Sequence, residues 1–281
     1  MPELPEVETV ARELQPLLRG RRVVAVVAGP KALRFAWQKQ WTPLVVGRAI
    51  EAVRRRGKWL VIELDNQSIL LAHLGMTGQM RVTAVGDPAE PHTHLRFELD
   101  DGNEWRYRDV RRFGGIRRCE NPAEVDRLIG GRLGPEPWRL DAKEWHRALA
   151  RSKRPLKAIL LDQRVVAGVG NIYADESLFL ARLWPRQLGS ETTPAEAERL
   201  RSAIIEVLDR AIAARGSTIR DYIGGSGLKG GFQNALNVYG RTDLPCSNCR
   251  RLVQCIRLAG RSSHYCPGCQ KPAKRRRAAP R

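Results

Sequence analysis

The sequence lacks the features that would place the protein in a membrane or outside the cell. It contains no apolar run of about 18 residues, which is the length needed to cross a bilayer. Its start lacks the basic and then apolar pattern of a signal peptide. A secreted disulfide framework is also absent, because four of the six cysteines form two C-x-x-C pairs near the C-terminus. We therefore expect a cytoplasmic protein with no membrane partner.

Acidic residues are too few to balance the basic ones. The chain has 49 Lys and Arg against 30 Asp and Glu, which gives a net charge of +19. This excess indicates a polyanionic partner, most simply nucleic acid. The 281 residues are 42% hydrophobic, so the chain is long and apolar enough for two domains, each with a core.

The first half of the sequence predicts an antiparallel β domain that begins with a helix. Apolar residues from Val7 to Leu18 repeat at helical spacing, and Gly20 ends the run. Alternating segments separated by turn residues follow. These predicted strands are Arg22–Ala28, Trp59–Leu64, Ser68–Leu74, Gln79–Val85, Leu95–Leu99 and Glu104–Tyr107. We expect an α+β protein whose first domain, residues 1–134, packs two sheets into a β-sandwich.

The second half is predominantly helical and ends in a small cysteine-rich module. The predicted helices are Lys143–Ala150, Leu156–Leu161, Tyr173–Leu183 and a long amphipathic helix that begins at Pro194. We expect a helical domain over residues 135–234, a cysteine module over 235–271 and a basic tail over 272–281.

The two C-x-x-C pairs predict a structural zinc site. Cys246 and Cys249 are separated by sixteen residues from Cys266 and Cys269, a spacing typical of four-cysteine zinc sites. Four thiolates suit a tetrahedral Zn²⁺ and leave no open position for a catalytic water. Because so short a module buries little apolar surface, metal binding should supply its folding energy.

Arg257 and Arg261 flank Gly260 between these pairs, where a hairpin tip should fall. An arginine there can grip a phosphate with two hydrogen bonds, although a solvated basic turn would have the same sequence.

The first residues, Met1-Pro2-Glu3-Leu4-Pro5-Glu6, offer an unusual nucleophile. Removal of Met1 would leave the secondary amine of Pro2, and α-amino groups titrate near about 7.7–8.0. Attack of such an amine on a sugar aldehyde carbon gives an iminium ion. Glu3 and Glu6 are candidate proton carriers. The alternative is an ordinary acidic helix start.

Three further stretches combine glycine with basic or apolar side chains. Lys153 precedes the glycine turn and Asn171 of VAGVGNIYADESLF, which could be a phosphate site or an ordinary helical hairpin. Met76 lies in HLGMTG, and DVRRFG supplies a basic and aromatic turn; either could contact DNA or be a simple β-turn. Lys58 could contact a phosphate, donate a proton or belong to a basic edge strand.

Together and in this order, these pieces closely resemble the bacterial formamidopyrimidine-DNA glycosylases. The resemblance covers PELPEVET, RGKWL, HLGMTG, DVRRFG, VAGVGNIYADESLF, VYGR and GRSSHYCPGCQ, which is nearly the whole chain. It implies a helix–two-turn–helix domain and a C-terminal zinc finger. It also implies that Pro2 attacks the sugar, Glu3 transfers a proton, Lys58 assists β-elimination and Arg261 assists δ-elimination.

The same resemblance implies contacts with DNA. It assigns His92, Arg112, Lys153 and Asn171 to the DNA backbone. It assigns Met76, Arg111 and Phe113 to the gap left when the damaged nucleotide is flipped out. Ser217–Gly231 matches a loop that closes over the extruded base.

We therefore expect a monomeric, zinc-containing DNA glycosylase and abasic-site lyase of base excision repair, acting on oxidised purines in double-stranded DNA. Two alternatives stay open. One is the endonuclease VIII type of glycosylase, which removes oxidised pyrimidines. The other is a zinc-finger nucleic-acid-binding protein without catalysis, which would give no reason for Pro2 and Glu3 at the terminus.

Overall fold

The computed structural model describes residues 2–217 and 230–272. It divides into two compact units, residues 1–133 with 209–234 and residues 134–208 with 235–281. Most of the expected Ser217–Gly231 loop and the basic tail lie outside the described residues.

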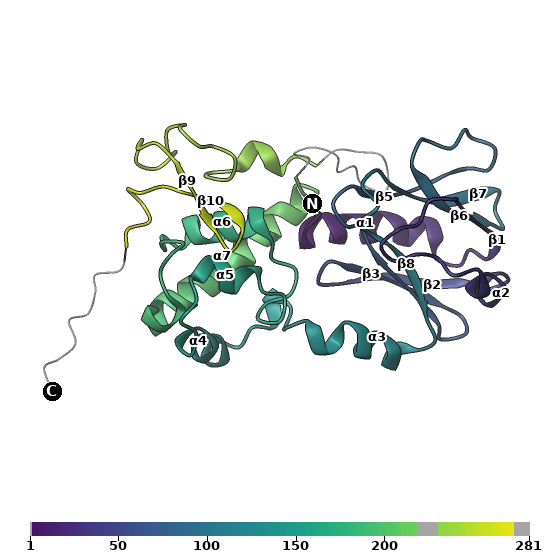
Figure 1. Ribbon diagram of the computed structural model, residues 1–281, viewed down its shortest axis with the longest axis horizontal. Coiled ribbons are helices and arrows are strands. Elements are labelled where there is room, and N and C mark those ends of the chain that lie inside the picture. The colour runs from purple at the N-terminus through teal and green to yellow at the C-terminus, as the bar shows by residue number, and fades with distance from the viewer. Residues whose placement is uncertain (1, 218–229, 273–281) are drawn as a thin grey trace, which may run out of the picture. The chain divides into compact units, whose positions relative to one another are not determined.

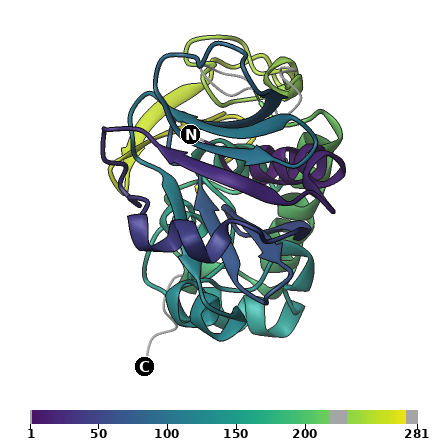
Figure 2. The same cartoon turned by 90° about the vertical axis from the view of Figure 1, so that its right-hand side faces the viewer.

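The first unit contains two four-stranded antiparallel sheets, ordered β1-β6-β7-β5 and β2-β3-β4-β8 (Figures 1 and 2). The strands are β1 (Val23–Ala28), β2 (Ile50–Arg56), β3 (Trp59–Leu64), β4 (Ile69–His73), β5 (Gly78–Ala84), β6 (Thr93–Leu99), β7 (Asn103–Asp109) and β8 (Gly115–Cys119). Both sheets contribute to one apolar core, which confirms the expected β-sandwich.

Helix α1 (Leu4–Leu18) completes this core, as its apolar spacing predicts. Val10, Leu14 and Leu18 are fully buried and belong to the same cluster as Phe97 and Trp105 of the sheets. Burial of a large apolar side chain stabilises a fold by about 1.5–3 kcal/mol, so α1 is part of the structural frame. The residues at the first turn of α1 are therefore held in a fixed position.

All six predicted strands are confirmed to within two residues, and two more were missed. Strand β2 escapes a pattern search because its buried residues Ile50, Ala52 and Val53 do not alternate and are followed by three consecutive arginines, residues 54–56. Strand β8 escapes the same search because it contains two arginines and only one buried large aliphatic residue, Ile116. Short helices α2 (Thr42–Val45) and α3 (Pro122–Leu128) were also not expected.

The second unit consists of helices and a β-hairpin. The helices are α4 (Ala142–Ala150), α5 (Leu156–Leu161), α6 (Asn171–Leu180) and α7 (Pro194–Ala213), whose last five residues belong to the first unit; the hairpin is β9 (Gln254–Leu258) and β10 (Arg261–Tyr265). Asp141 caps α4 by accepting two backbone N–H bonds, as expected. Helix α6 begins two residues earlier and ends three residues earlier than the predicted Tyr173–Leu183.

Glu176 of α6 holds the segment that leads into the cysteine module. Its buried carboxylate accepts the backbone N–H groups of Asn237, Val238 and Tyr239, each at 2.9 Å. Hydrogen bonds to a charged acceptor contribute about 1.5–3 kcal/mol each, and buried donors left without an acceptor are costly. This one side chain therefore fastens the chain entering the module to α6.

We expect Glu176→Gln to lower the free energy of unfolding by about 3 kcal/mol, because an amide NH₂ would face backbone donors that need an acceptor. Urea unfolding of the zinc-loaded protein measures the loss. The control is Glu198→Gln, which removes an exposed ion pair with Arg201 and should cost less than about 1 kcal/mol. Equal stability of the two variants would contradict the assignment.

Candidate active site

The N-terminal residues are buried at the first turn of α1. Glu3 is the N-cap of the helix and forms a reciprocal capping box with Glu6. In this box Glu3 N–H donates to Glu6 Oε2 at 2.9 Å. Glu6 Oε1 accepts the backbone N–H of Ser217 at 2.8 Å. Both carboxylate oxygens of Glu6 thus accept hydrogen bonds from backbone N–H groups, which favours a positioning role for Glu6. Pro2 precedes this box and is itself buried.

Lys58 lies in the turn between β2 and β3 and is only 8% exposed. The end of β2 is tied to α1 by an ion pair, in which Arg55 Nε lies 2.7 Å from Glu8 Oε2. Burial raises the pKa of Glu8, but the hydrogen bonds and charges of Arg55 and Arg12 outweigh it, so the pKa lies below its ordinary value. This pair holds the turn that carries Lys58 against the first turns of α1.

His73, at the end of β4, is kept neutral. Burial, together with the positive charges of Lys58 and Arg34, lowers its pKa to about 4. Its Nδ1 accepts the backbone N–H of Gly75 at 2.9 Å, and its ring packs against Trp59 with the ring centres 4.7 Å apart. The imidazole therefore helps to shape the turn that begins the HLGMTG loop. This role was not apparent from the sequence.

The expected gap-filling residues occupy two loops of the first unit. Met76 lies between β4 and β5, and Arg111 and Phe113 lie between β7 and β8. Phe113 is 44% exposed, and the Arg111 guanidinium carbon lies 4.7 Å from the centre of its ring. An exposed phenylalanine covered by an arginine is suited to stacking against bases.

The two expected backbone contacts of this unit, His92 and Arg112, are exposed and adopt left-handed backbone conformations, with φ of 70° and 57°. Such conformations are uncommon outside glycine and are often found at functional sites. Arg112 Nη1 donates to the carbonyl of Ala32 at 3.3 Å, which orients its side chain.

In the second unit, α5 and α6 are joined by a compact double turn. The side chain of Gln163 braces this turn, because its amide donates to the Val169 carbonyl at 2.7 Å and accepts the Gly168 N–H at 2.9 Å. Asn171 is the first residue of α6, where free N–H groups point outward. Lys153 is exposed just before α5, and it has no ion pair within residues 2–217 and 230–272.

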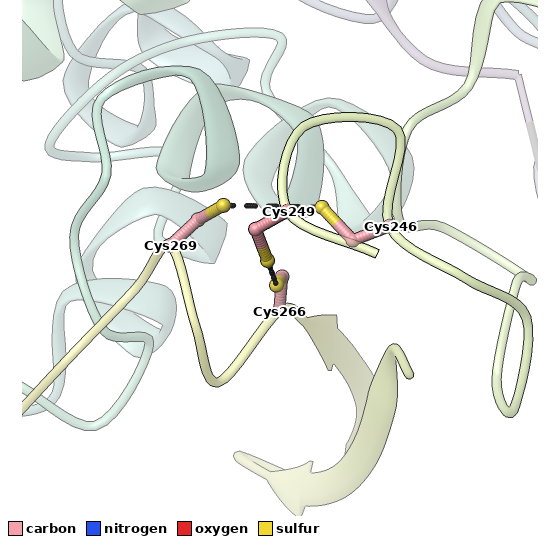
Figure 3. A group of neighbouring side chains, drawn as sticks. All are labelled: Cys246, Cys249, Cys266 and Cys269. Carbon is pink, nitrogen blue, oxygen red and sulfur yellow. Dashed lines mark hydrogen bonds between the residues drawn. The ribbon is translucent and has the colours of Figure 1, made fainter. Parts of the chain in front are cut away.

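The four expected cysteines converge, with all four Sγ atoms within 4.8 Å of one another (Figure 3). The Cys246–Cys269 and Cys249–Cys266 Sγ distances are 3.8 and 3.3 Å. A tetrahedral Zn²⁺ with Zn–S bonds of about 2.3 Å requires sulfur atoms about 3.8 Å apart. The donor set therefore fits one structural zinc ion. A side chain at Gly268 would place its Cβ 2.7 Å from Cys249 Sγ, so this tight turn requires glycine.

The finger hairpin is anchored on α6 by a buried carboxylate. Asp175 Oδ2 accepts the backbone N–H of His264 at 2.9 Å and lies 3.0 Å from His264 Nδ1. Its other oxygen accepts a bond from Lys157 Nζ at 2.6 Å, and Lys157 also donates to the Asn171 carbonyl at 2.8 Å. At the hairpin tip, Arg261 is exposed and opens β10, as expected.

The sequence-predicted residues thus divide between the units. Pro2, Glu3, Lys58, Met76, His92, Arg111, Arg112 and Phe113 belong to the first, and Lys153, Asn171, Arg261 and the four cysteines to the second. Sequence reasoning missed the residues that position them, above all Asp175 and Glu176. Both are acidic and polar, and no local pattern marks them as buried. No helix among the described residues is long and apolar enough to span a membrane.

Comparison with known proteins identifies the family. The family model of the formamidopyrimidine-DNA glycosylase N-terminal domain matches residues 1–116, that of the H2TH domain residues 133–222, and that of the zinc finger found in FPG and IleRS residues 243–272. The chain therefore belongs to the formamidopyrimidine-DNA glycosylase family. It is a DNA glycosylase of base excision repair with abasic-site lyase activity.

Individual relatives agree along almost the whole chain. The formamidopyrimidine-DNA glycosylase of Moorella thermoacetica is 46% identical over 92% of this chain and 95% of its own length. The formamidopyrimidine-DNA glycosylase of Desulforamulus reducens is 43% identical over 96% of this chain and 99% of its own length. The Lactococcus lactis Fpg in complex with abasic-site DNA has a TM-score of 0.89, with 36% identity over 96% of this chain and 99% of that chain.

The zinc site can be tested with a matched pair of cysteine variants. We expect the parent protein to contain one zinc per chain and Cys249→Ser to lose it, because the finger depends on a complete thiolate shell. Cys255→Ser is the control, since Cys255 is exposed in the same finger but outside the cluster. Metal analysis after dialysis measures the difference. Zinc retained by Cys249→Ser at the parental stoichiometry would contradict the assignment.

The protonation of His73 can be followed by NMR. We expect its ring to titrate near pH 4, well below its ordinary value of 6.5. The unfolded chain then binds this proton first, so His73 makes folding less favourable as the pH falls from 6.5 towards 4, by at most about 1.4 kcal/mol per pH unit. His73→Gln should flatten the slope of stability against pH in that window. A midpoint near 6.5 would contradict the burial of this ring.

Proposed function

We propose that this enzyme removes oxidised purines from double-stranded DNA with Pro2 as the nucleophile. After Met1 is removed, the Pro2 amine attacks C1′ of the damaged nucleotide and the base leaves as Glu3 transfers a proton. The resulting iminium ion draws electrons from the neighbouring C–H and C–O bonds. Lys58 assists the β-elimination, and Arg261 assists the δ-elimination that completes strand cleavage.

The observation that carries this proposal is the arrangement at the first turn of α1. Glu6 fixes the backbone of Glu3, and Glu3 is directly bonded to Pro2. The catalytic pair is thus built on a helix packed into the core, and such rigid support is what precise positioning requires. The Glu8–Arg55 pair holds the turn carrying Lys58 to the same helix.

The choice of substrate is supported by the names of the relatives and by solved complexes. The Lactococcus lactis Fpg has been solved with DNA containing N7-benzyl-Fapy-dG, and a MutM with DNA containing carbocyclic 8-oxo-G. We propose the same lesion class here. His92, Arg112, Lys153 and Asn171 would contact the DNA backbone, and the net charge of +19 would add affinity that weakens with salt.

We also propose that the chain divides into a β-sandwich domain at residues 1–134, a helical domain at 135–234, a zinc finger at 235–271 and a basic tail at 272–281. The cytoplasm, where the bacterial chromosome lies and thiols stay reduced, is the compartment that suits a zinc-thiolate DNA repair enzyme.

The roles of Pro2 and Glu3 can be separated in one experiment. A form that retains Met1 has an amide at Pro2 and no available lone pair, so borohydride trapping on abasic DNA should vanish. Glu3→Gln keeps the amine, and its base excision should fall by about 10²–10⁴-fold because general acid–base assistance is lost. Trapping on a pre-formed abasic site should suffer less, since the aldehyde is already present.

Both forms should be assayed on duplexes with oxidised guanine, a ring-opened purine, an oxidised pyrimidine or an abasic site. Trapping by the Met1-retaining form at the parental rate would move the nucleophile elsewhere, most simply to Lys58. Faster excision of the pyrimidine than of both purines would favour the endonuclease VIII type of activity instead.

A further inference from the structure

Asp109, the last residue of β7, is completely buried and has no assigned role in the reaction. Four donors satisfy its carboxylate. Oδ1 accepts bonds from the Thr77 hydroxyl at 2.5 Å and the Arg111 N–H at 3.2 Å. Oδ2 accepts bonds from the Gly114 N–H at 2.9 Å and the Tyr107 hydroxyl at 3.3 Å. All four are neutral groups, and a buried carboxylate is costly unless its hydrogen bonds are made.

These donors come from the two loops that carry the gap-filling candidates. We define the Met76 loop as residues 74–77 and the Arg111 loop as residues 110–114. Thr77 is next to Met76, and its hydroxyl oxygen also accepts the Arg111 N–H at 2.9 Å. Gly114 is next to Phe113. Each of the three gap-filling side chains is therefore within one residue of a group bonded to Asp109.

The two loops also pack closely against each other. A Cβ at Gly75, where φ is +61°, would lie 2.6 Å from the backbone nitrogen of Gly114. A Cβ at Gly114 would lie 2.1 Å from the carbonyl oxygen of His73. Contact between the loops is thus backbone against backbone. The buried carboxylate satisfies the N–H groups that such contact would otherwise leave unbonded.

The backbone of Asp109 is fixed as well. Its N–H donates to the His92 carbonyl at 3.0 Å, and its own carbonyl accepts a bond from His94 Nε2 at 3.0 Å. The segment bearing a proposed DNA-backbone contact is therefore joined to the same point. No side-chain atom of Asp109 remains available to a substrate, so it would act through its neighbours.

We propose that Asp109 is a positioning residue that makes Met76, Arg111 and Phe113 a single rigid wedge for entry into the DNA base stack. This inference rests on the proposed gap-filling role of those three residues. The side chains of a rigid wedge are already ordered in the folded protein, so they lose little conformational entropy when they bind DNA. More of the free energy of their contacts with DNA is therefore available to open the duplex. Asp109 should matter for extrusion of a stacked, paired base and little for the chemistry at Pro2.

Two variants and one control test the proposal. Asp109→Asn keeps the shape but turns an NH₂ towards a backbone N–H, and Thr77→Val cuts only the bridge between the loops. Thr83→Val is the control, because the Thr83 hydroxyl has no hydrogen-bond partner among the described residues. We compare single-turnover excision of 8-oxoguanine opposite cytosine with borohydride trapping on an abasic duplex. Thermal unfolding of each variant monitors its fold.

We expect excision to fall about tenfold or more in Asp109→Asn and less in Thr77→Val, with trapping within about twofold of the parent. A lesion whose opposite base is missing should restore much of the lost rate, because it is already unpaired. Parental excision by both variants would overturn the proposal. Equal losses of excision and trapping would also overturn it, since they would place the defect in the fold or the chemistry.

The gap-filling role itself is tested separately by Met76→Ala and Phe113→Ala. If these variants excise at the parental rate, the proposed role of the wedge is wrong. If they are slow while Asp109→Asn and Thr77→Val are not, only the positioning role of Asp109 is wrong. Should Asp109→Asn fail to fold, Thr77→Val decides the question, because it removes one hydroxyl and leaves the carboxylate its other three donors.

Discussion

Buried carboxylates that accept backbone N–H groups hold the irregular segments of both units in place. Glu6 binds the segments at residues 3 and 217, Asp109 joins the Met76 loop to the Arg111 loop, and Asp175 and Glu176 fasten the finger. Irregular backbone has no partner strand or helical turn to satisfy its polar groups, so each loop needs another acceptor. A carboxylate offers about four lone-pair sites on a short side chain, which explains its repeated use.

The finger shows why this constraint accompanies the metal. Four thiolates fix the ends of a short module, but zinc does not determine where the module lies against its neighbours. The contacts with α6 supply that information, since Asp175 binds the hairpin at His264 and Glu176 binds the chain that enters it. Zinc folds the module, and the adjacent carboxylates dock it.

Much of the fold, together with the zinc ligands, could be predicted because it depends on local patterns in the sequence. Alternation of apolar and polar residues predicted six strands, the helical spacing of apolar residues predicted α1, and the cysteine spacing predicted the zinc ligands. Strand β2 was hidden by its arginines, which form ion pairs that sequence cannot show, such as Arg55 with Glu8. The burial of the positioning carboxylates could not be predicted for a related reason. Their burial depends on partners up to 211 residues away, as with Glu6 and Ser217.

A chain of contacts from His264 through Asp175 to Lys157 links the finger to the start of α6. Lys157 is fully buried and bonds both Asp175 and the carbonyl of Asn171, and the other carboxylate oxygen of Asp175 bonds His264 of the hairpin. Oxidation of a finger thiol, such as the exposed Cys249, would expel zinc and release His264 from Asp175. The change would therefore reach α6, where Asp175 would keep its bond to Lys157 but lose both of its contacts with the hairpin.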